Sequence, residues 1–146
     1  MVTRSSQAAF RRACYDTRVA RILMVDDDET LLQVMGDYLE SAGHAVARCA
    51  DPTQAAELAE KTAPDLAILD YEMPRLSGTQ LLTELRGGGR THALPVIFLS
   101  GVEGILYASQ VAPDPRVRYL RKPASFDDLD GAIAALLGPK GRSKNA

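Results

Sequence analysis

Five polar side chains in this 146-residue chain follow apolar stretches, at the points where buried strands would end. They are three carboxylates, a hydroxyl and an ammonium: Asp26, Asp27, Asp70, Ser100 and Lys122. Stretches that are apolar throughout are typical of strands buried on both faces of a parallel sheet, and such sheets bind ligands at the carboxyl ends of their strands. The five groups are therefore predicted to meet at one edge, where they could hold a hard cation and a phosphoryl group.

Five strands are predicted to alternate with five helices, joined by short loops. The strands are expected at residues 22–25, 44–49, 66–69, 96–99 and 116–120. Apolar residues recur at helical spacing from Leu31 to Ala42, from Pro52 to about Thr62, around Leu81 to Leu85, and from Phe126 to Leu136. This alternation predicts an α/β fold, a doubly wound parallel sheet with right-handed crossovers.

The helix after Ser100 is the weakest of the five. Val102, Ile105 and Leu106 could form its apolar stripe, but Gly101 and Gly104 each cost a helix up to ~1 kcal/mol.

Composition indicates one reduced, acidic domain. Hydrophobic residues make up 46% of the chain, which suits a single core, and no stretch approaches the ~20 apolar residues of a membrane span or resembles a signal peptide. Cys14 and Cys49 stand alone, as expected of reduced thiols in a cytoplasmic protein. The whole chain carries −2, and its two ends carry +3 each, so residues 21–137 carry −8. No DNA-binding motif accompanies the basic ends.

Residues 20–138 resemble a bacterial response-regulator receiver domain, similar to the chemotaxis regulator. The resemblance rests on Ile-Leu-Met-Val-Asp-Asp-Asp at 22–28, Leu-Asp-Tyr-Glu-Met-Pro at 69–74, Ser100 and Lys122-Pro123, all in the family's order and spacing. It implies a flavodoxin-like sheet of strand order 2-1-3-4-5 with helices on both faces.

The resemblance also implies roles for these residues. Asp70 would take a phosphoryl group from a phosphohistidine on a histidine kinase or phosphotransfer protein, a reaction that needs positioning and charge neutralisation more than a strong base. Asp27, Asp70 and the Glu72 backbone carbonyl would bind Mg²⁺, or Mn²⁺, with Asp26 acting through a metal-bound water. Because clustered like charges repel, magnesium is expected to stabilise the fold.

Further residues would bind and report the phosphoryl group. Lys122 would face its oxygens, helped by a cis bond to Pro123, and Ser100 would donate a hydrogen bond to it. Tyr119 stands where the family has a switch aromatic, and its rotation would reshape the face formed by the helix after Ser100, the last strand and the last helix, where an effector docks. The side chain of Glu72 is expected to flank the path of water to the acyl phosphate and to tune its lifetime.

Asp28 and Ser125 are assigned structural roles. Asp28, or Glu29, is expected to start the helix that follows rather than to bind metal. Ser125 can cap the last helix, with Asp128 three residues later.

We expect residues 1–19 to be a basic extension, disordered or a short helix, and residues 139–146 a basic tail. The tail is too short for a DNA-binding or enzymatic domain, so the first interpretation is a stand-alone signalling receiver, not an enzyme, that docks on an effector or relays its phosphoryl group. The second is the same domain cut from a hybrid kinase or a longer regulator.

Two other interpretations remain. A haloacid-dehalogenase-like phosphatase also uses a strand-end Asp with magnesium, but its usual second acid is an Asp two residues after the nucleophile, near the start of the chain. In this sequence that position is Glu72, after the middle strand, and the acidic pair follows an earlier strand instead. A receiver-like scaffold that is never phosphorylated is disfavoured by the complete set of site residues.

Overall fold

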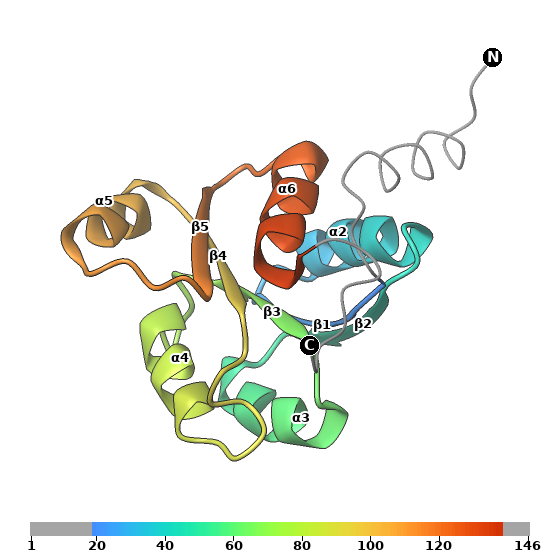
Figure 1. Ribbon diagram of the computed structural model, residues 1–146, viewed down its shortest axis with the longest axis horizontal. Helices are drawn as coiled ribbons and strands as arrows, with labels where there is room; N and C mark the ends of the chain where they lie inside the picture. The colour runs from blue at the N-terminus through green and yellow to red at the C-terminus, as the bar shows by residue number, and fades with distance from the viewer. Residues whose placement is uncertain (1–18, 139–146) are drawn as a thin grey trace.

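The computed structural model describes residues 19–138 and contains one parallel sheet with helices on both faces (Figure 1). The strand order is β2-β1-β3-β4-β5, so the predicted fold class and topology are confirmed. The strands are β1 Arg21–Val25, β2 Ala45–Cys49, β3 Leu66–Asp70, β4 Val96–Ser100 and β5 Val117–Arg121. The helices are α2 Glu29–Ser41, the 3-10 turn η1 Pro52–Gln54, α3 Ala55–Thr62, α4 Gly78–Arg86, α5 Val102–Gln110 and α6 Phe126–Leu137.

Two hydrophobic layers enclose the sheet. Because side chains alternate along a strand, Ile22 and Met24 of β1 pack with α2 and α6, while Leu23 and Val25 pack with α3 and α4 on the other face (Figure 1). β3 and β4 are buried along their whole length. The central strands are therefore held from both sides, which fixes the positions of the residues at their carboxyl ends.

Side-chain caps begin the helices that follow these ends. Asp28 accepts a hydrogen bond from the Leu31 amide at the start of α2, and Ser125 accepts one from the Asp128 amide at the start of α6, both as predicted. Ser77 and Gln80 form a reciprocal capping box at α4 that the sequence analysis did not identify. Each cap satisfies amides that a helix leaves without an internal partner.

Two predictions about the last part of the sheet were wrong. β5 is an edge strand, so Val117, Tyr119 and Leu120 are only half-buried and Arg118 is exposed. In α5, two of the three residues of the expected apolar stripe face solvent: Val102 and Leu106 are 53% and 56% exposed, while Ile105 is half-buried. The buried residue of α5 is Gly104, because this helix approaches β4 and Tyr71 too closely for a side chain.

Several predictions concern the chain ends and the thiols. Residues 1–18 and 139–146, with the predicted extension and tail and Cys14, lie outside the described residues. Cys49 is a buried free thiol, as expected. No helix within residues 19–138 is long and apolar enough to cross a membrane.

Gly78 supports the loop after Asp70, so we expect Gly78→Ala to destabilise the protein by about 2 kcal/mol or more. A Cβ at Gly78 would lie 2.8 Å from the Tyr71 Cα and 2.9 Å from the Asp70 carbonyl oxygen, and backbone atoms cannot move aside cheaply. Gly89→Ala is the matched control, because a Cβ there meets no atom within 4 Å. Urea unfolding measures both; equal stabilities for the two variants would contradict this account of Gly78.

Candidate functional site

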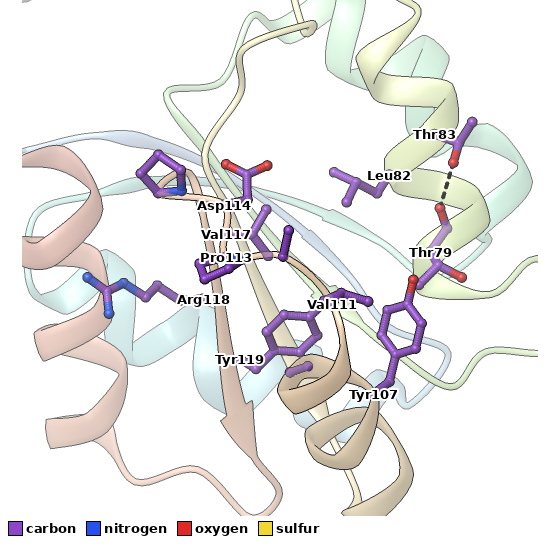
Figure 2. A pocket seen from close by; sticks show the side chains of 13 residues that line it. Thr79, Leu82, Thr83, Tyr107, Val111, Pro113, Asp114, Val117, Arg118 and Tyr119 are labelled. Carbon is purple, nitrogen blue, oxygen red and sulfur yellow. Dashed lines mark hydrogen bonds between the residues drawn. The ribbon is translucent and has the colours of Figure 1, made fainter.

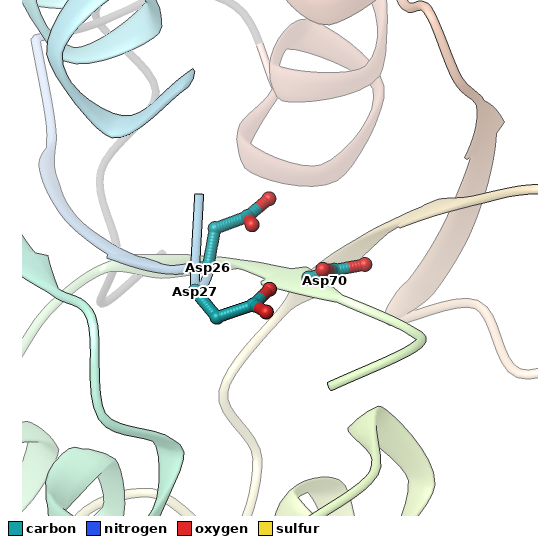
Figure 3. Close-up of side chains that lie close together, drawn as sticks. All are labelled: Asp26, Asp27 and Asp70. Carbon is teal, nitrogen blue, oxygen red and sulfur yellow. The ribbon is translucent and has the colours of Figure 1, made fainter. Parts of the chain in front are cut away.

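Three carboxylates meet at the carboxyl edge of the sheet. Asp26 and Asp27 follow β1, and Asp70 is the last residue of β3. Because Val25 pairs with Leu69 on the adjacent strand, Asp26 and Asp70 are each one residue beyond this pair. Figure 3 shows Asp26 and Asp27 reaching toward Asp70. One oxygen from each lies within 4.8 Å of the others, and Asp26 and Asp70 are only 2% and 4% exposed. The edge predicted from the sequence therefore gathers its three acids in one place.

Lys122 faces two of these acids. Its Nζ lies 3.0 Å from Asp70 Oδ1 and 3.5 Å from Asp26 Oδ2. The side chain comes from the segment just after β5, whose backbone is tied to β4 because the Lys122 amide donates to the Ser100 carbonyl at 2.7 Å. The Lys122–Pro123 peptide bond is cis. The ammonium thus lies at the same edge as the acids although β5 is two strands away from β3 in the sheet.

Burial disfavours the ionised forms of Asp26 and Asp70. It raises the pKa of Asp26 to about 6, against the lowering effect of the Asp28 amide, and the neighbouring Asp70 carboxylate raises it further. Burial also raises the pKa of Asp70, although Lys122 opposes this. Burial lowers the pKa of Lys122, but its bond to Asp70 and the charge of Asp26 outweigh that effect, so the net shift is upward. The site is short of positive charge near neutral pH.

One buried oxygen of the cluster has no hydrogen-bond partner. The Asp28 amide donates to Asp26 Oδ1 at 2.9 Å, and the Glu72 amide donates to Asp70 Oδ1 at 3.1 Å. Asp26 Oδ2 is buried and accepts no hydrogen bond; within residues 19–138 its ion-pair partner is the Lys122 ammonium, at 3.5 Å. Hard oxygen donors around a buried, unsatisfied carboxylate oxygen fit a hard divalent cation such as magnesium.

Ser100 lies at this edge but points to other partners. It is fully buried, and its hydroxyl lies 3.2 Å from Glu72 Oε1 and 3.0 Å from the Gly101 carbonyl oxygen. Within residues 19–138 it makes no hydrogen bond with Asp70. The Glu72 carboxylate also accepts the Gly101 amide at 3.0 Å. These contacts of Glu72 were not predicted from the sequence, although the glycine four residues after Ser100 was an available signal of a close approach.

Tyr119 borders a cavity away from the acids. Its ring centre lies 5.2 Å from that of Phe98 and 6.3 Å from that of Tyr71. A cavity of about 620 Å³ lies between α4 and the segment that joins α5 to β5. Figure 2 shows Tyr119 and Tyr107 beside it, with Leu82 on the α4 side. The predicted switch aromatic therefore has an aromatic cluster beside it and open space next to it.

Comparisons with known proteins identify the family of this chain. The family model described as the response regulator receiver domain matches residues 22–134. The DNA-binding dual master transcriptional regulator RpaA of Synechocystis is 32% identical over 117 residues, which are 80% of this chain and 48% of the relative. The chain spans about half the length of the curated relatives it matches.

Solved receiver domains share both sequence and fold. A receiver domain protein from Clostridium thermocellum is 33% identical, with a TM-score of 0.68 over 81% of this chain and 94% of that one. The receiver domain of a Pseudomonas aeruginosa sensor histidine kinase, solved with a magnesium ion coordinated in its active site cleft, is 27% identical, with a TM-score of 0.72 over 82% and 98%. With its strand order and its cluster of strand-end acids, this chain belongs to the response regulator receiver domain family.

Proposed function

We propose that this receiver domain accepts a phosphoryl group on Asp70 and signals through the change that follows. The observation that carries the proposal is the placement of the Lys122 ammonium 3.0 Å from Asp70 Oδ1, beside two further carboxylates. An ammonium there can neutralise charge on an incoming phosphoryl group, and the strand-end carboxylate is the nucleophile. The donor would be a phosphohistidine on a sensor histidine kinase or a histidine phosphotransfer protein.

Magnesium is the cofactor that the donor set favours. Asp27, Asp70 and the Glu72 backbone carbonyl would hold the ion, with Asp26 acting through a bound water. When bound, the ion supplies positive charge that neutralises the phosphate oxygens. The raised pKa of Asp26 and its buried oxygen without a hydrogen bond support the proposal, since a bound cation would favour the ionised carboxylate and contact that oxygen.

The chain's own residues bind and orient the phosphoryl group. Lys122 would keep its proton, because its pKa is raised, and hold the phosphoryl oxygens by charge. Asp70 is kept in position by the Glu72 amide, so its second oxygen is the one available for attack. Ser100 would donate a hydrogen bond to the phosphoryl group once that group is in place.

Tyr119 and the α5, β5, α6 face would carry the signal. A move of Ser100 toward Asp70 would free space near Tyr119, whose ring also borders the cavity of Figure 2 and so has room to turn. The exposed apolar residues Val102, Leu106 and Tyr107 of α5 give this face a surface for an effector protein. Phosphorylation would then shift a population between two forms of one docking surface.

The proposed function applies both to a stand-alone receiver and to a receiver that is part of a longer protein. A stand-alone receiver would dock on its effector or relay the phosphoryl group, whereas a receiver within a longer regulator or hybrid kinase would act on its own attached domains. Catalysis would be confined to its own phosphorylation and dephosphorylation. Turnover of an external phosphate ester would instead support the haloacid-dehalogenase-like alternative.

We expect the protein to gain one phosphoryl group when it is incubated with magnesium and acetyl phosphate or phosphoramidate. Asp70→Asn should abolish the gain, because the amide is not a nucleophile, and Lys122→Met should slow it by about tenfold or more, because one charge on the phosphoryl oxygens is lost. Intact mass spectrometry gives the readout.

Glu57→Gln is the control, since it removes an exposed carboxylate on α3, away from the cluster. A folded wild-type protein that takes no phosphoryl group and binds no beryllofluoride would refute the proposed function and favour the scaffold interpretation.

Asp26 should make stability depend on pH in the absence of divalent cations. Its pKa in the folded protein is about 6, above the ordinary 3.8, so between these values the folded state holds more protons and its stability falls as the pH rises. Asp26→Asn should therefore be more stable than the wild type near pH 7.5, by on the order of 2 kcal/mol, with most of this gain lost below about pH 4.5. Urea unfolding in EDTA measures the difference.

Magnesium should raise the melting temperature of the wild type, and more so near neutral pH than below about pH 4.5, where protons compete for Asp26. Asp27→Asn should remove most of this rise, and Glu57→Gln should keep it. A rise of equal size in all three proteins would show that magnesium binds elsewhere.

A further inference from the structure

Glu72 bridges the two halves of the site. Its backbone amide donates to Asp70 Oδ1 at 3.1 Å, while its side chain turns away to the start of α5. There, Oε1 accepts the Gly101 amide at 3.0 Å and lies 3.2 Å from the Ser100 hydroxyl. A carboxylate that accepts an amide at a helix N-terminus gains from both the hydrogen bond and the helix dipole.

The Ser100 hydroxyl has one proton, and its neighbours compete for it. Glu72 Oε1 at 3.2 Å and the Gly101 carbonyl oxygen at 3.0 Å are both acceptors. Ser100 is fully buried, so water offers it no ready alternative. A proton engaged by these acceptors is not available to a phosphoryl group on Asp70.

Gly104 makes this arrangement possible. A Cβ at position 104 would lie 1.8 Å from the Ser100 Oγ, so the hydroxyl occupies space that the side chain of any other residue there would fill. A Cβ at Gly101 would lie 3.4 Å from both Glu72 carboxylate oxygens, which is close to ordinary van der Waals contact. A residue that weakens α5 as a helix is therefore the one that lets Ser100 approach its first turn.

We propose that Glu72 is a positioning residue that holds the Ser100 hydroxyl away from Asp70 in the unphosphorylated protein, as an internal anion in competition with the phosphoryl group. This inference rests on the proposed function, because the phosphoryl group that would compete with Glu72 for the Ser100 hydroxyl is the one proposed to form on Asp70. We call this pair, the Glu72 carboxylate and the Ser100 hydroxyl, the latch. Phosphorylation must open the latch before Ser100 can turn.

The latch weakens phosphoryl binding by keeping the competent form rare. Apparent affinity falls in proportion to the fraction of molecules whose Ser100 is free, so a latch closed in nine of ten molecules costs about tenfold. The Glu72 charge could also weaken binding by plain repulsion of an anion. The two effects differ in one respect: only the latch requires the Ser100 hydroxyl.

A double-mutant cycle separates these effects. The variants are Glu72→Ala, Ser100→Ala and the double variant, and the probe is beryllofluoride with magnesium, titrated by calorimetry. Glu72→Ala should tighten binding by about three- to tenfold when Ser100 is present and by less than about twofold when it is Ala. Glu103→Ala is the matched control, because it removes an exposed carboxylate from the same first turn of α5 and should change affinity by less than about twofold.

An equal gain from Glu72→Ala in both backgrounds would overturn the latch and leave charge repulsion as the role of Glu72. No gain in either background would also overturn it.

The latch has a second readout that does not need a phosphoryl group. In the unmodified protein, Glu72→Ala should move the Gly101 amide proton upfield in the NMR spectrum, because a charge-assisted hydrogen bond is lost, and Glu103→Ala should leave it in place. An unmoved Gly101 signal would refute the latch. A wild type that binds no beryllofluoride but shows this shift would refute the proposed function alone, with Glu72 still bound to the start of α5.

Discussion

Repulsion among three carboxylates is the constraint on which the rest of the site depends. Asp26 and Asp70 are almost wholly buried, and an oxygen from each lies within 4.8 Å of one from Asp27. Charges held this close in a region of low dielectric cannot all ionise cheaply without a cation. The other polar contacts of Asp26 and Asp70 reduce this repulsion, because they come from hydrogen-bond donors. These donors are the amides of Asp28 and Glu72 and the ammonium of Lys122.

Such a cluster needs a rigid support, and the sheet supplies it. β1 and β3 are adjacent, so the acids that follow them are neighbours, and β4 lies between β3 and β5, so Ser100 and Lys122 reach the same edge. Both faces of the central strands are covered by helices, which leaves their ends little freedom to spread apart. The energy of folding thus holds together groups that would otherwise repel one another.

Much of this could be predicted from the sequence, because buried strands and their polar ends leave local signals. The run from Ile22 to Asp27 marks both a strand and two acids of the cluster, and Asp28 and Ser125 mark helix starts by residue type alone. The face of α5 could not be predicted in this way. Val102 and Leu106 are apolar and suitably spaced, yet the helix packs through Gly104 because of its distance from β4, which is a tertiary property.

The direction of the Glu72 side chain also depends on how α5 packs against the sheet, and it affects both the charge near Asp70 and the contacts of Ser100. A fourth carboxylate aimed at Asp70 from two residues away would add repulsion to a site already short of positive charge. At the start of α5 the same carboxylate instead finds the Gly101 amide and the Ser100 hydroxyl. One orientation of the Glu72 side chain therefore both relieves charge at the acidic cluster and restrains Ser100, and under the proposed function a phosphoryl group that recruits Ser100 would change both together.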